Sequence, residues 1–212
     1  MRFPPGAVIA IIACFANAPL RAEPIGQATA VERDVTHAAG GASARLDFGD
    51  RVEQDELVTT AAASSAKLQF LDQTELMIGP ISSVKLDRFV YNPDRTAKTI
   101  TLDLLRGGFR FVTGKSEYKA YVLRTPEAII GVRGTVIGIF VEKGRTSVKL
   151  KQGGMTVCVR GGGKRCQDLE ALEDVVVVTA RGVTKPSPRK GLAPDFSLWC
   201  QAGKAGCGLP AQ

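Results

Sequence analysis

Short apolar–polar alternations, interrupted again and again by turn residues, limit the fold of this sequence more than any other feature. In residues 66–70 the first, third and fifth positions are apolar and the two between them are polar. A strand with this pattern buries one face and exposes the other to water. The same alternation recurs at 84–86, 100–104, 109–111 and 148–150. The pattern therefore predicts a series of β-strands.

Turn-forming residues separate these runs at intervals of roughly 8 to 20 residues. They lie at 48–50, 72–74, 79–80, 92–94, 106–108, 113–114, 131, 143–144 and 152–154. This spacing predicts an all-β sandwich, barrel or coil of many short strands. The β-branched run 173–179 is expected to be a final buried strand. One short helix is expected around 167–172.

The amino terminus reads as a signal peptide. Arg2 precedes an apolar run at 7–16, and small or polar residues follow as far as Ala22. The run is too short to span a membrane, which takes about 20 residues. Cleavage after Ala22 would start the mature chain at Glu23. The alternative is a lipoprotein signal with Cys14 as the acylated residue. We expect a periplasmic or secreted protein.

The charge balance argues against a nucleic-acid partner. The net charge of +7 falls to +5 when residues 1–22 are removed, because Arg2 and Arg21 leave and no acidic residue does. The basic residues are interleaved with acids, and only 6% of the residues are aromatic. A nucleic-acid surface would need a basic stripe or stacking aromatics. The excess charge is compatible with a weak attraction to anionic surfaces.

Four cysteines follow the signal peptide, and in an exported chain they predict two disulfides. Three pairings are formally possible. Glycines 161–163 would place Cys158 opposite Cys166 in a hairpin, which favours a local bond there and a second one between Cys200 and Cys207. The spacing lacks the Cys-x2-Cys pairs of structural zinc sites, so no metal is expected.

These features divide the chain into four parts: a signal peptide at 1–22, an all-β domain at 23–180, a basic proline-containing linker at 181–195, and a disulfide-closed tail at 196–212. Trp199 in the tail is expected to anchor it to the domain, with a partner-binding hook as the alternative.

No residue set resembles an active site, so we expect neither an enzyme nor a cofactor. The single histidine, His37, lies in a turn-like segment and is interpreted as a solvated loop residue. Neighbouring acids such as Asp47 and Asp50 are interpreted as turn and surface charges. The glycines before Lys164 lack the leading glycine and the following Ser or Thr of a phosphate loop.

The most distinctive segment runs from residue 123 to residue 139. It contains Thr125-Pro126-Glu127-Ala128 and then Val132-Arg133-Gly134-Thr135. These residues resemble the FecR domain family, although Ile137 replaces the customary aromatic. Matching stretches precede them at 48–50, 56–60, 66–68, 71–76 and 79–86, with Gln73 where the family usually has glycine. The resemblance spans roughly residues 26–160.

The resemblance implies an extracytoplasmic domain that is solenoid-like or a strongly twisted β-sandwich. Members that regulate iron-siderophore uptake also carry a sigma-factor-binding segment and a membrane helix, and this sequence shows neither. It resembles a stand-alone exported form. We expect a non-catalytic periplasmic module that binds another envelope protein in signalling or scaffolding. The alternative is a carbohydrate- or peptidoglycan-binding module, for which only Phe89, Tyr91, Tyr118 and Tyr121 could supply aromatics.

The signature itself has a structural interpretation. Thr125-Pro126 fixes an extended backbone, and Gly131 and Gly134 permit conformations that other residues resist. Arg133 between the glycines is expected to bond carbonyls or a carboxylate across a turn. The alternative makes Arg133 a ligand-reading residue.

Overall fold

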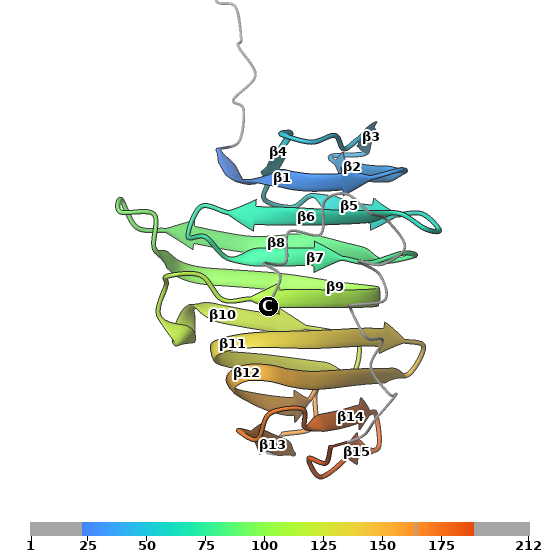
Figure 1. The fold of residues 1–212 in the computed structure, drawn as a ribbon, viewed down its shortest axis with the longest axis vertical. Coiled ribbons are helices and arrows are strands. Elements are labelled where there is room, and N and C mark those ends of the chain that lie inside the picture. The colour runs from blue at the N-terminus through green and yellow to red at the C-terminus, as the bar shows by residue number, and fades with distance from the viewer. Residues whose placement is uncertain (1–22, 164, 189–212) are drawn as a thin grey trace, which may run out of the picture.

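The computed structural model describes residues 23–163 and 165–188, and their regular secondary structure is almost entirely strand (Figure 1). The all-β prediction is confirmed. The strands are β1 (Pro24–Glu32), β2 (Val35–Ala39), β3 (Ala42–Arg45), β4 (Arg51–Glu53), β5 (Leu57–Thr60), β6 (Ser65–Phe70), β7 (Glu75–Ile78), β8 (Ser83–Tyr91), β9 (Ala97–Val112), β10 (Tyr121–Arg124), β11 (Ala128–Glu142), β12 (Arg145–Val159), β13 (Cys166–Leu169), β14 (Val175–Thr179) and β15 (Gly182–Val183). A single turn of 3₁₀ helix, η1 (Tyr118–Ala120), precedes β10. None of the described residues forms a helix that could cross a membrane.

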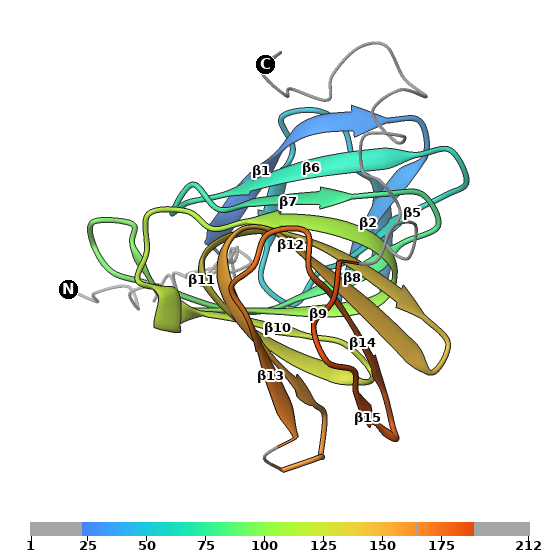
Figure 2. The same ribbon diagram turned by 60° about the horizontal axis from the view of Figure 1, so that its bottom comes forward.

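The strands form one continuous 15-stranded sheet that curls around a core (Figures 1 and 2). Hydrogen bonding links two rows of strands. The first row contains β4, β1, β6, β7, β14 and β15, and the second contains β3, β2, β5, β8, β10 and β13. The long strands β9, β11 and β12 take part in both rows. The result is the expected solenoid-like stack.

Strand β9 passes from one row to the other at Gly107. Its first part pairs with β8 up to Arg106, and residues from Gly107 onward pair with β7 and β11. Gly107 has φ +93°, and a Cβ there would lie 2.6 Å from the Cα of Ser82. Both the backbone angle and the close approach require glycine at this position.

Alternating burial produces the core. In β6 every second side chain is buried, as the pattern of residues 66–70 predicts. The largest fully buried side chains come from both rows: Tyr121, Phe109, Phe111, Leu46, Leu68, Leu76, Ile78, Leu86, Ile100, Leu102, Leu104 and Leu123.

A fully buried carboxylate, that of Asp72, joins the turn between β6 and β7 to the start of β10. Its Oδ1 accepts a hydrogen bond from the Thr74 backbone N–H at 3.1 Å. Its Oδ2 accepts bonds from the hydroxyls of Thr74 (2.9 Å), Ser116 (2.8 Å) and Tyr121 (2.7 Å). Every donor is neutral, so hydrogen bonds alone replace the water that the carboxylate loses on burial.

Two tyrosines, the buried Tyr121 and the half-buried Tyr91, feel the charge of this carboxylate. Burial, with the negative charge of Asp72 as a further cause, raises the pKa of Tyr121. The same two causes raise the pKa of Tyr91, whose hydroxyl donates to the Ile25 carbonyl at 3.1 Å.

The structure differs from the sequence analysis in three places. Residues around 167–172 were expected to be helical, but Cys166–Leu169 forms β13, because pairing with β12 supplies the backbone bonds. Residues 182–187, assigned to the linker, continue the sheet through β15 and a bridge between Ser187 and Val175. His37 lies in β2, with its Nδ1 3.2 Å from Oε1 of the buried Glu56, and is not a loop residue.

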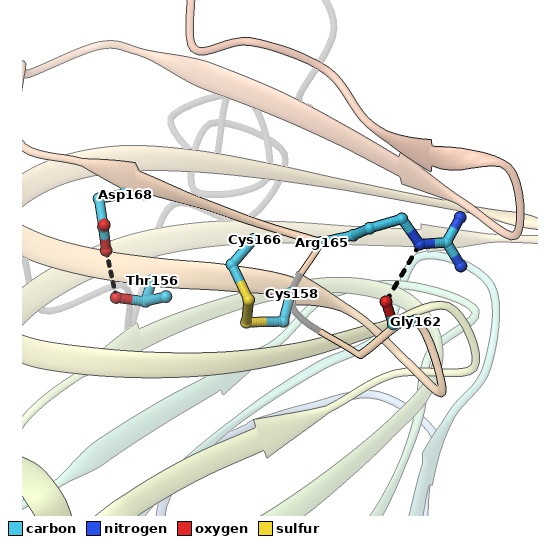
Figure 3. The surroundings of a disulfide bond; sticks show 6 residues. All are labelled: Thr156, Cys158, Gly162, Arg165, Cys166 and Asp168. Atoms are coloured by element: carbon cyan, nitrogen blue, oxygen red, sulfur yellow. Dashed lines mark hydrogen bonds between the residues drawn. A yellow bond between two sulfur atoms is a disulfide. The ribbon is translucent and has the colours of Figure 1, made fainter.

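Cys158 and Cys166 are bonded and face each other directly in the β12–β13 register, as the hairpin argument predicts (Figure 3). Thr156 and Asp168 form the next hydrogen-bonded side-chain pair on these strands. The expectations for residues 1–22, Cys14, Trp199, Cys200 and Cys207 lie outside the described residues and stay predictions.

Replacing Asp72 by asparagine should destabilise the domain by roughly 2–3 kcal/mol, because an amide leaves several buried hydroxyl donors without an acceptor. The matched control is Asp94→Asn, since Asp94 makes the same bonds to Thr96 at the surface. Denaturant unfolding of both variants checks this. Equal losses in the two variants would contradict a special role for the buried carboxylate.

Alkaline pH should weaken the fold through the tyrosines. An unfolded tyrosine ionises near pH 10, whereas the raised pKa values keep Tyr91 and Tyr121 protonated in the folded state. Unfolding then releases protons, so the free energy of unfolding should fall as the pH rises above about 10. Tyr91→Phe should make this fall shallower. A parent protein equally stable at pH 9 and pH 11 would contradict the assignment.

Candidate functional site: the outer face of strand β11

The first part of the signature is a tightly bonded reversal between β10 and β11. The Thr125 hydroxyl accepts the Ala128 N–H at 2.8 Å, and the Thr125 N–H donates to the Ala128 carbonyl at 2.8 Å. The Thr125 hydroxyl also lies 2.8 Å from that of Thr146, and Arg160 donates to the Thr125 carbonyl. Pro126 projects outward at the apex. These bonds leave Thr125 no capacity for an outside ligand.

The second part of the signature is a bulge in β11. The register between β11 and β12 breaks between Arg133 and Val136. Gly134 has φ +60°, with open space around its Cβ position, and Gly153 on β12 has φ +79°. A Cβ on Gly153 would lie 2.8 Å from the Gly134 carbonyl carbon. Gly131, expected to need unusual backbone freedom, has neither a positive φ nor a near neighbour at its Cβ position.

The bulge marks the point where β11 changes rows. Before it, Gly131 pairs with Val122 of β10, and after it Val136 pairs with Val112 of β9. Thr135 is buried here and its backbone bonds to Thr113: its N–H donates to the Thr113 hydroxyl and its carbonyl accepts the Thr113 N–H, whereas its own hydroxyl has no partner among the described residues. The glycine and the threonine of the signature therefore shape a corner of the sheet.

Between the reversal and the bulge, β11 alternates between core and surface. Ile130 and Val132 are buried, whereas Ile129 is 38% exposed and the Arg133 side chain is 43% exposed. Gly131 lies between these two exposed side chains, and because it has no side chain of its own the surface is depressed there. We name Ile129, Gly131 and Arg133 the signature face.

Carbonyls or a carboxylate were expected as partners of Arg133, and the described structure gives it a carboxylate. Among the described residues its guanidinium has one partner, the Glu170 carboxylate, at a long 3.4 Å. Glu170 is itself 80% exposed, and an exposed pair of this kind contributes about 0–1 kcal/mol. The side chain lies over Gly154, where a Cβ would be 3.4 Å from Nε and Nη2. Arg133 is therefore an outward-facing cation.

Arg124, directly before Thr125, makes the strong pairs instead. Its Nε and Nη2 donate to the two carboxylate oxygens of Asp103 at 2.6 and 2.8 Å, and Nη2 also donates to Asp87 at 2.7 Å. These bonds, led by those to Asp103, raise the pKa of Arg124. This role was not predicted, although Asp103 lies between two leucines of its strand and Arg124 directly follows Leu123.

Cross-strand register brings these groups into one row. Asp103 lies opposite Arg124, Arg124 opposite Ile129, Ile129 opposite Cys158, and Cys158 opposite Cys166. An ion cluster therefore flanks the signature face on one side and the disulfide flanks it on the other. The described residues contain no group of three or more side chains placed to hold a metal ion. The face offers a charge and a small apolar area, which suit contact with another macromolecule.

Alanine substitutions at three glycines should separate the cost of a positive φ from the cost of a close backbone contact at the bulge. Gly131→Ala should be neutral, Gly134→Ala should cost about 1 kcal/mol through its φ alone, and Gly134→Val should cost more. Gly153→Ala should destabilise the protein most, by at least about 3 kcal/mol, because the added Cβ would clash with the Gly134 backbone, which cannot move away. Denaturant unfolding measures all four. A Gly153→Ala protein as stable as Gly131→Ala would contradict the bulge.

Comparison with known proteins agrees with this architecture. The family model described as FecR protein matches residues 56–183. Two crystal structures of a candidate anti-sigma factor from Parabacteroides distasonis ATCC 8503, at 2.50 and 1.65 Å resolution, share the fold with TM-scores of 0.53 at 15% identity. Each match covers 68% of this chain and 64% of the neighbour. A search of curated proteins found no match.

The family match covers more than half of the chain and includes both the reversal and the bulge. It also contains Asp72 and the Arg124 ion cluster. The chain belongs to the FecR protein family.

Proposed function

We propose that this chain is a non-catalytic module of the cell envelope that binds another envelope protein through the signature face, in signalling or scaffolding. One observation carries the proposal. The Thr125 hydroxyl is consumed by internal bonds and Thr135 is buried, whereas Ile129 and Arg133 project from the same strand into solvent. A signature with only structural duties would not need an exposed isoleucine beside a loosely paired arginine.

Family membership supports a regulatory role without catalysis. The structural neighbour is described as a candidate anti-sigma factor, a class of protein that works by binding other proteins. The signal peptide expected at residues 1–22 would place the domain in the periplasm or outside the cell. There its partner would be another protein of the envelope.

The composition of the signature face also fits a protein contact. Interfaces place an apolar contact at the centre and polar groups at the rim, and arginine is enriched among the residues that dominate binding energy. Ile129 is exposed between Arg124 and the disulfide, with Arg133 further along the strand. The bidentate Arg124–Asp103 pair and the disulfide fix the surroundings, so little ordering is needed on binding.

The glycan alternative lacks its stacking surface. Of the four aromatics that could have built one, Phe89 is 7% exposed, Tyr121 is 2% exposed and Tyr91 is half-buried. Tyr118 alone is exposed, at 51%. One tyrosine does not make a platform for a saccharide ring, so protein binding is the function that the surface supports best.

Arg133→Ala should leave stability within about 0.5 kcal/mol of the parent, because it removes only a long surface pair. It should reduce partner capture about tenfold if Arg133 is a central contact. The measurement is photo-crosslinking in the intact envelope from a reactive residue at position 129, followed by identification of the captured protein. Thermal melting is measured in parallel.

Two matched variants control the experiment. Arg181→Ala removes another exposed arginine that lies beyond β14, and it should capture the partner normally. Glu170→Ala removes the pair but keeps the arginine, and it should also bind. An Arg133→Ala protein that melts early would restore the structural interpretation. An Arg133→Ala protein that melts like the parent and captures the partner equally well would show that the signature face is not the binding site.

A further inference from the structure

A polar groove lies at the amino-terminal end of the sheet, away from the signature face. It has a volume of about 390 Å³, within the range of ligand sites. It is bordered by β1, by β4 and by the end of β6, and by the turns at residues 73 and 95. Its lining consists of Pro24, Gly26, Gln27, Arg51, Gln69, Phe70, Leu71, Gln73 and Arg95.

The groove gathers cations that nothing in the described structure neutralises. Arg51 and Arg95 both line it, and neither side chain has a hydrogen-bond or ion-pair partner among the described residues. None of the lining residues carries a carboxylate. Glu53 on the same strand and Asp94 beside Arg95 lie outside the lining, and the Asp94 carboxylate accepts bonds from Thr96.

Three glutamines complete the polar surface. The side-chain amides of Gln27, Gln69 and Gln73 also have no partner among the described residues. Each amide can donate and accept. Two arginines and three glutamines thus line one space, and none of their side-chain polar groups has a partner among the described residues.

Two of these side chains occupy strained positions. Gln73 has φ +70° and Arg95 has φ +63°, a region that favours glycine. Each is the middle residue of an Asp-x-Thr turn in which the aspartate bonds the threonine. The turns fix the backbone and hold both side chains at the rim of the groove.

The floor of the groove is rigid, and one wall is an open strand edge. A Cβ on Gly26 would lie 2.5 Å from the Gln69 carbonyl oxygen and 2.9 Å from the Phe70 Cα, so β1 and β6 are in close backbone contact. Within the described part of the chain, strand β4 pairs with β1 alone and ends its row. An unpaired edge beside a groove is a surface on which an extended peptide can add.

We propose that this groove binds an extended acidic peptide segment, with carboxylates at Arg51 and Arg95 and peptide groups at the three glutamines. Charge complementarity selects the acid. The free edge of β4 favours a peptide over a saccharide. The only aromatic residue of the lining, Phe70, is 2% exposed, so its ring offers no surface on which a sugar could stack. The site is separate from the signature face and does not depend on the function proposed for that face.

The test is an NMR titration of the isotope-labelled mature protein with the capped peptide acetyl-Val-Glu-Val-Glu-amide. Saturable shifts should appear at the backbone amides of Gln27, Gln69 and Gln73. Acetyl-Val-Gln-Val-Gln-amide should bind about tenfold more weakly, because it lacks the charges. The double variant Arg51→Gln/Arg95→Gln should lose about tenfold in affinity for the acidic peptide and melt like the parent.

Arg88→Gln/Arg106→Gln is the matched control, since it removes the same charge from exposed arginines outside the lining. It should bind like the parent. Equal losses in both double variants would overturn the proposal, because binding would then follow net charge alone. Absence of saturable shifts, or stronger binding of a tetragalacturonate, would also overturn it. Crosslinking from position 129 should be unchanged in Arg51→Gln/Arg95→Gln, which keeps the two binding proposals separately testable.

Discussion

The hydrogen bonds to the buried Asp72 carboxylate tie together segments that the backbone ladder does not. The sheet supplies bonds between neighbouring strands, whereas the turn after β6, the connection at Ser116 and the first residue of β10 all bond to this one carboxylate. Because the carboxylate is fully buried, each missing donor would leave charge without a partner. Together with the pairing of β10 to β9 and β11, this site fixes the position of β10, and with it Arg124 and the reversal at Thr125.

Downstream of that site, close backbone contacts decide where the sheet turns. Gly107 permits β9 to pass Ser82, and Gly153 permits β12 to pass Gly134. These contacts put the outward residues of β11 on a fixed surface. The family signature therefore has two parts: a bulge that shapes a corner of the sheet, and a short exposed stretch of β11 that this corner holds in place.

Local patterns predicted much of this fold, and long-range contacts account for the failures. The alternation in residues 66–70 and the glycine loop between Cys158 and Cys166 act within one hairpin, so the sequence reveals them. The helix expected around 167–172 was wrong because pairing with β12 overrode local propensity. His37 looked like a loop residue because Glu56, its partner, lies 19 residues away. The partners of Arg124 and Arg133 depend on cross-strand register, which a single sequence does not specify.

The three strands shared by both rows give the domain an unusual mechanical character. Two packed sheets joined only by loops can slide or separate along their common core when they are pulled apart. Here β9, β11 and β12 run continuously from one row into the other, so the covalent backbone itself crosses between them. A load applied across the rows is carried by peptide bonds, whereas a load along the stack would open hydrogen bonds one strand at a time from the ends of the rows, at β4 and β3 or at β15 and β13. A domain of this design would resist shear and yield by peeling from its ends.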